Sequence, residues 1–185
     1  MKLEKRFQSR NSTQASEGVI SGYAAVYDSP SLPLPGGRRG QFVERIAPGA
    51  FDKSLEEKRS VKLFFGHNDR DLPLASSPGT LQLESDGKGL RFSADIADTT
   101  QGRDVMTLME RGDLGGEGSV SFGFQVVQDE WNEARTTRTL KEVRLYEVSI
   151  VSEAAYPATA SNLRHSPGVK ARKLQLSRAR LGLIK

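Results

Sequence analysis

The sequence contains no cysteine, only two histidines, and no apolar run long enough to cross a membrane. Disulfide bonds, thiolate catalysis and cysteine-ligated zinc are therefore excluded, and a histidine-rich metal site is not expected. No apolar core of the kind found in signal peptides follows the first five residues. The 185 residues, 36% hydrophobic and 27% charged, favour one soluble, loop-rich domain with tails.

Acidic residues are missing from segment 168–185, which carries six lysines and arginines. Without these six charges, the chain of formal net charge +4 has a body of charge −2, so nucleic acid is not an expected partner. We expect a flexible segment at residues 1–17, one domain at 18–162 and a basic tail at 163–185. Residues 1–9 also have the pattern of a short edge strand. The tail's leucines fit either docking on a partner or a solvated tail.

Alternating apolar residues predict strands in several stretches of the chain. These are residues 19–27, 42–46, 61–67, 81–83, 90–96, 118–127 and 139–152. Turn residues at 86–89 predict a hairpin. A helical period predicts a helix over 99–111 that ends at Gly112, and a second helix is expected over 47–57. The fold class is therefore mainly β with a few helices (α+β), as an antiparallel β-barrel or a strongly curved sheet with helices packed on it.

The stretch 118–127 organises the rest of the chain. Its apolar face is formed by Val120, Phe122, Phe124 and Val126. Its other face is formed by Ser119, Ser121, Gly123 and Gln125. A glycine inside a strand often marks the close approach of a ligand or another chain, so Gly123 predicts room at this face. Ser121 lies beside that room and is the candidate nucleophile.

His67 is the only histidine in the expected domain, because His165 falls in the tail. It shares strand parity with Val61, Leu63 and Phe65, which directs it inward at the end of a strand. A single histidine in that place is commonly structural. A serine hydrolase without cysteine or metal, however, depends on such a residue as its general base.

Glu147 is the candidate acid. By strict alternation it shares a mostly apolar face with Val143, Leu145, Ser149 and Val151, where a carboxylate is costly unless it is paired. An ion pair with Arg138 or Arg144 explains it equally well, and Glu142 and Asp69 compete for the same role. A Ser-His-acid triad is recognised by geometry, so spacing alone does not decide.

Six blocks in order resemble one family. They are Glu44–Phe51, Gly66–Asp69, Gly89–Leu90, Ser121–Phe124, Leu145–Val151 and Tyr156–Ala158. Together they resemble the prohead maturation proteases of HK97-type tailed phages, over about residues 22–160. These are serine endopeptidases whose fold, a single β-barrel wrapped by helices, is similar to that of the herpesvirus assembly proteases.

The resemblance implies specific site residues. The nucleophile falls on Ser121, the histidine on His67 and the acid on Glu147. The stretch 113–120 is longer and richer in glycine than is usual in the family. It places Ser119 two residues upstream on the same face, so Ser119 is the alternative nucleophile. No cofactor is implied, and backbone N–H groups of residues 115–118 are candidates for the oxyanion hole.

The resemblance also implies partners and a location. The expected substrates are the capsid scaffold, or a scaffold-like segment of the major capsid protein precursor, and the protease itself. A homodimer and autocleavage are expected by analogy. The expected location is the inside of the immature capsid, in the bacterial host cytoplasm, and no membrane partner is expected. The alternative is a non-catalytic capsid-assembly or scaffold-binding module with a protease-like fold.

Overall fold

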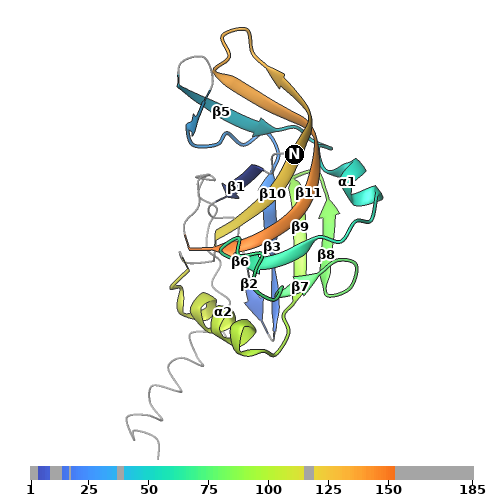
Figure 1. Ribbon diagram of the computed structural model, residues 1–185, viewed down its shortest axis with the longest axis vertical. Helices are drawn as coiled ribbons and strands as arrows, with labels where there is room; N and C mark the ends of the chain where they lie inside the picture. The colour runs from blue at the N-terminus through green and yellow to red at the C-terminus, as the bar shows by residue number, and fades with distance from the viewer. Residues whose placement is uncertain (1–3, 9–13, 17, 37–39, 115–118, 153–185) are drawn as a thin grey trace, which may run out of the picture.

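The computed structural model describes residues 4–8, 14–16, 18–36, 40–114 and 119–152. Strands dominate this part of the chain, with two short helices between them (Figure 1). The elements are β1 (Glu4–Gln8), β2 (Gln14–Ser16), β3 (Val19–Val26), β4 (Leu34–Pro35), β5 (Gln41–Ile46), α1 (Asp52–Glu56), β6 (Lys62–Phe65), β7 (Ala75–Ser76), β8 (Leu81–Ser85), β9 (Gly89–Asp95), α2 (Thr100–Arg111), β10 (Ser119–Trp131) and β11 (Thr137–Val151). The prediction of a mainly β protein with a few helices is confirmed.

The strands form two sheets. The larger has the order β1-β10-β11-β5-β4, with β6 also paired to β11 and β7 to β6, and the smaller has the order β2-β3-β9-β8. Most pairs are antiparallel, but β11 runs parallel to β5 near its start and parallel to β6 near its end. The sheets do not close into a barrel, so the predicted single barrel is not confirmed. In Figure 1 the long β10–β11 pair crosses the smaller sheet, and α2 lies at the end opposite the β10–β11 turn.

Local sequence signals account for several elements. The predicted hairpin is β8–β9, where the Asp86 carboxylate accepts hydrogen bonds from two turn N–H groups. The predicted helix over 99–111 is α2, which begins with Thr99 as its N-cap and ends at left-handed Gly112. The helix expected over 47–57 shortens to α1, because Gly49 adopts a left-handed φ of +79° just before it.

The core lies between the two sheets. Phe51, just before α1, contacts Phe122 of β10 edge-on at 5.5 Å between ring centroids, and Phe122 stacks on Phe124 at 5.0 Å. The predicted apolar face of the central strand is thereby confirmed, with Phe122 and Phe124 fully buried. This core fixes one face of the β10–β11 pair and leaves the opposite face for other side chains.

The N-terminal stretch contributes two strands. β1 pairs with β10, with Phe7 opposite Ser121, and is the edge strand that the sequence predicts within residues 1–9. β2 pairs with β3. The predicted boundaries at residues 17 and 163 stay predictions, and the basic tail lies outside the described residues. No helix in the described part of the chain is long and apolar enough to span a membrane.

Candidate active site

The β10–β11 pair has two chemically different faces. Residues that oppose one another on neighbouring antiparallel strands share a face. On the core face the opposing pairs are Val120–Ile150, Phe122–Val148 and Phe124–Leu145. On the other face Ser121 lies opposite Ser149, and Gly123 lies opposite Glu147. The predicted polar face of the central strand therefore meets a second polar set on β11.

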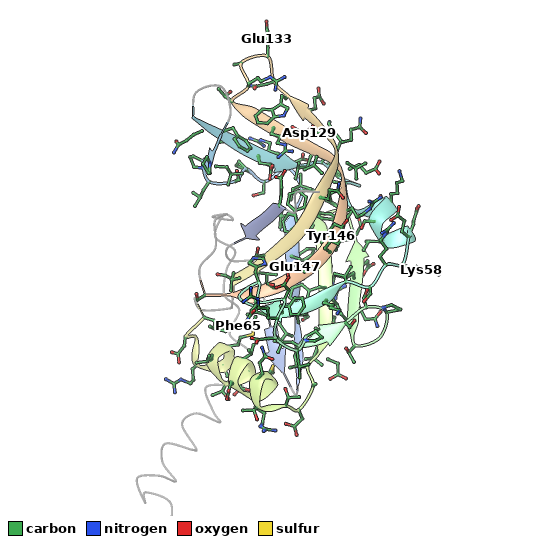
Figure 2. All side chains as sticks on the ribbon, in the orientation of Figure 1. Lys58, Phe65, Asp129, Glu133, Tyr146 and Glu147 are labelled. Atoms are coloured by element: carbon green, nitrogen blue, oxygen red, sulfur yellow. The ribbon has the colours of Figure 1, made fainter. Side chains whose placement is uncertain are left out.

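A β-bulge on β11 creates this arrangement. The register of β10 against β11 shifts directly after the Gly123–Glu147 pair, and Tyr146 is the extra residue on β11. Figure 2 labels Tyr146 and Glu147 beside one another on that strand. The prediction that Glu147 shares a face with Val143 and Leu145 is wrong, because the bulge breaks the strict alternation. Both apolar residues belong to the core, whereas Glu147 belongs to the opposite face.

Gly123 provides the space that the Glu147 side chain occupies. A Cβ atom on Gly123 would lie 2.5 Å from Glu147 Cγ and 2.7 Å from Glu147 Oε1. Real Cβ atoms essentially never come so close to other atoms. The glycine does mark a close approach, as the sequence predicts, but the approaching group is a glutamate of the same domain rather than a ligand or another chain.

His67 reaches the same face from the end of β6. Gly66 and His67 both adopt left-handed backbone angles, with φ of +63° and +59°, and the Gly66 N–H donates to the Ile150 carbonyl oxygen at 2.8 Å. A left-handed histidine is uncommon and turns the chain sharply after the strand. His67 Nδ1 then lies 2.6 Å from Glu147 Oε1, with the two side chains 8% and 6% exposed.

This turn places His67 beside the sheet face that carries the two opposing serines. The turn holding His67 is fixed to Ile150, and its ring contacts Glu147, three residues earlier on β11. The residue of the same face between those two points is Ser149, whose cross-strand partner is Ser121. The three predicted residues His67, Ser121 and Glu147 therefore gather on one face of one sheet, and Ser121 is fully buried there.

The competing acids have other surroundings. Glu142 forms an ion pair with Lys53 at 3.0 Å, and Asp69 is exposed in the turn after His67. Neither has the short contact with His67 Nδ1 that Glu147 has.

The two arginines proposed as ion-pair partners for Glu147 contact other carboxylates. Arg138 lies 2.6 Å from Asp129, 3.0 Å from Glu4 and 3.2 Å from the fully buried Glu44. Burial alone would lower the pKa of Arg138, but these three carboxylates raise it. Arg144 lies 3.9 Å from Glu57. The imidazole of His67, by contrast, contacts Glu147 directly.

Ser119, the alternative nucleophile, lies further along the same face of β10. It is 6% exposed and opposes Val151. Two residues of a strand span about 6.6 Å, so Ser119 is one such step further from the Gly123–Glu147 pair than Ser121. The glycine-rich residues 115–118, predicted to supply oxyanion-hole donors, lie outside the described residues.

Ser149 is the site residue to which sequence reasoning gave no role. It is fully buried, and its Oγ has no hydrogen-bond partner among the described residues. The sequence showed only that Ser149 lies two residues after Glu147 and so shares a strand face with it. Its place opposite Ser121 follows only from the strand register. No group of three or more histidine, aspartate or glutamate side chains in the described part of the chain could hold a metal ion.

Comparison with known proteins decides the family. The profile of the caudovirus prohead serine protease family matches residues 4–174. The chain belongs to this family. The prohead protease family predicted from the six sequence blocks is thereby confirmed, and the chain is a member of a serine protease family that acts in phage head assembly.

The structure of this prohead protease family member is similar to a solved one. It matches the bacteriophage T4 capsid assembly protease, gp21, with a TM-score of 0.50 and 10% sequence identity. The match covers 80% of this chain and 96% of gp21, and at this identity the likeness is one of fold. No curated protein sequence matches the chain significantly. The likeness to herpesvirus assembly proteases stays a prediction.

Proposed function

We propose that this prohead protease is an endopeptidase in which Ser121 is the nucleophile, His67 the general base and Glu147 the acid that orients the histidine. The observation that carries the proposal is the 2.6 Å contact between His67 Nδ1 and Glu147 Oε1, on the sheet face that Ser121 shares. A buried histidine held by a carboxylate next to a serine is the arrangement that activates a hydroxyl for acyl transfer.

The carboxylate determines which nitrogen acts as the base. With the Nδ1–H donating to Glu147 Oε1, the neutral imidazole carries its lone pair on Nε2. Nε2 is itself buried, so little bulk water competes for that lone pair. The negative charge of Glu147 then stabilises the imidazolium that forms when Nε2 takes a proton.

The reaction follows from these roles. The Ser121 hydroxyl gives its proton to His67 Nε2 while Oγ attacks the peptide carbonyl carbon, and the carbonyl oxygen becomes an oxyanion. Collapse of this intermediate breaks the C–N bond, and His67 returns the proton to the leaving amine. Water, activated in turn by Nε2, hydrolyses the acyl-enzyme and restores Ser121. The proposed hydrogen-bond donors to the oxyanion are backbone N–H groups of residues 115–118.

The family and the name of gp21 support a place for this activity in phage head assembly. The proposed substrates are the capsid scaffold, or the scaffold-like segment of the major capsid protein precursor, and the chain itself. The proposed site of action is the interior of the immature capsid in the bacterial host. A homodimer belongs to the same proposal.

The burial of Ser121 sets a condition on the reaction. Because the residue is 0% exposed, a peptide carbonyl can reach Oγ only after the site opens. The proposal is therefore tested with the natural substrate present. The full chain and a Ser121→Ala variant are co-expressed with the capsid precursor, and the intact masses of both proteins are measured.

The outcomes are distinct. If the wild type trims the precursor or itself and Ser121→Ala does not, the proposal holds, since loss of a nucleophile costs several orders of magnitude in rate. Ser119→Ala is the matched control and should retain activity. If Ser119→Ala is the inactive variant, the nucleophile is Ser119. If the wild type cleaves nothing during assembly, the chain is a non-catalytic assembly module.

A further inference from the structure

Ser149 carries a polar group that the mechanism above does not use. The residue is fully buried, and its Oγ has no hydrogen-bond partner among the described residues. A buried hydroxyl without a hydrogen bond destabilises the folded state, and a native structure that keeps one calls for an explanation. The place of Ser149 beside Ser121 suggests that the explanation is functional.

The neighbours of Ser149 limit what its hydroxyl can contact. In the register of the larger sheet it lies between Ser121 of β10 and Phe64 of β6. Phe64 is 7% exposed and offers no hydrogen-bonding side-chain atom. Along β11, the preceding residue of the same face is Glu147, which holds His67. Among the side chains directly opposite Ser149 on the two flanking strands, Ser121 alone is polar.

The strand register allows a hydrogen bond between the two serines. Opposing residues of an antiparallel pair have Cβ atoms about 4.5–5.5 Å apart, and hydrogen bonds between hydroxyl side chains in this position stabilise sheets. A change of χ1 between staggered positions redirects a serine Oγ without moving the backbone. A serine Oγ that donates its own proton to a histidine still has two lone pairs to accept another donor.

We infer that Ser149 is a positioning residue: its O–H donates to Ser121 Oγ and holds the Ser121 hydroxyl toward His67 Nε2. This inference rests on the proposed function. The Ser149 proton stays on Ser149 throughout, while the Ser121 proton moves to His67. Negative charge that develops on Ser121 Oγ strengthens the bond from Ser149, because charge-assisted hydrogen bonds are stronger than neutral ones. The contact therefore acts on the rate of attack rather than on substrate binding.

The test compares Ser149→Ala with a matched variant, Ser31→Ala. Ser31 is also buried, at 6% exposure, but its Oγ accepts a 2.8 Å hydrogen bond from the Glu44 N–H. Because Ser121 is buried, a fluorophosphonate that labels reactive serines is titrated against wild type and both variants in the presence of the capsid precursor. Saturation kinetics give a maximal labelling rate and a half-saturating concentration. Melting temperature and cleavage of the co-expressed capsid precursor are measured in parallel.

The two variants should behave in opposite ways. Ser149→Ala should lower the maximal labelling rate roughly tenfold, which is the size of one hydrogen bond to the nucleophile, without changing the half-saturating concentration. Its melting temperature should stay close to that of wild type, because the loss of one neutral hydrogen bond is offset in part by the removal of a buried hydroxyl. Ser31→Ala should melt lower and label at the wild-type rate.

The remaining outcomes overturn the inference. A Ser149→Ala variant that labels like wild type contradicts the role of Ser149 alone, provided that Ser121→Ala is not labelled. A change confined to the half-saturating concentration assigns Ser149 to substrate contact instead. If wild type neither labels nor cleaves, or if the label maps to a residue other than Ser121, the proposed function is lost, and the role of Ser149 with it.

Discussion

Substitution of Gly123 by alanine tests the site while leaving every proposed catalytic residue unsubstituted. The added methyl carbon would lie 2.5 Å from Glu147 Cγ and 3.0 Å from its Cδ. Carbon atoms ordinarily pack about 3.5–4.0 Å apart, so the glutamate must retreat by about 1 Å. The His67 Nδ1–Glu147 Oε1 contact of 2.6 Å would then stretch to about 3.6 Å, outside hydrogen-bond range.

The expected loss is one of catalysis more than of folding. Removal of the orienting acid from a serine protease triad costs roughly 10⁴-fold in kcat, so its displacement should cost roughly 10²–10⁴-fold, or about 3–5 kcal/mol. The free energy of unfolding should change by less than about 2 kcal/mol, because alanine suits a strand better than glycine and offsets part of the clash.

The assay is cleavage of the co-expressed capsid precursor, with fluorophosphonate labelling of the chain in the presence of that precursor. Gly87→Ala is the matched control, because nothing lies within 4 Å of a Cβ at that glycine, and it should behave as wild type. In a Glu147→Ala background, Gly123→Ala should cause no further loss, since both changes remove the same contact. A Gly123→Ala variant within threefold of wild type, or additive losses in the double variant, would refute the reasoning.

Two other predictions concern stability. Arg138→Ala should lower the free energy of unfolding by about 3–5 kcal/mol in urea titrations, because it leaves the fully buried Glu44 without its guanidinium partner. Glu44→Gln in that background should restore part of the loss. If Arg138→Ala causes no loss, the cluster around Arg138 is not stabilising. A hydrogen bond from the Tyr23 hydroxyl lowers the pKa of Asp86. The stability that this hydrogen bond contributes is therefore present above the unfolded-state pKa of an aspartate, and it is lost as the pH falls through the lower folded-state pKa. Asp86→Asn should therefore flatten the dependence of unfolding free energy on pH below about pH 5, and an unchanged slope would contradict this.

The closed state of the site is consistent with a protease that acts at one stage of assembly. Ser121 and Ser149 are fully buried, and the His67 side chain is 8% exposed. Such a site does not cleave at random, because a substrate must first gain access. Labelling of Ser121 before and after capsid assembly would measure the opening directly.

Elements whose signals lie within a few residues were predictable from the sequence. The alternation of Val120, Phe122 and Phe124 determined the core face of β10, since a strand repeats every two residues whatever it packs against. Thr99 and Gly112 marked the two ends of α2, because capping depends on the backbone of adjacent turns. The six ordered sequence blocks also led to the family, which the profile match over residues 4–174 confirms.

The contacts of the candidate site depended on residues far apart in the chain, and only the tertiary structure decided them. A single extra residue, Tyr146, transfers Glu147 from the expected apolar face to the polar one, and no local pattern announces such a bulge. The left-handed turn at His67 and the missing side chain at Gly123 make sense only once the glutamate 80 positions after that histidine lies between them. Sequence by itself determined the longer strands and α2, because those signals are local, but it did not predict the short strands β2, β4 and β7. Register, sheet closure and the pairing of His67 with Glu147 depend on contacts between residues far apart in the chain. A one-residue shift in register changes the face of every side chain that follows it, so these contacts decide the site.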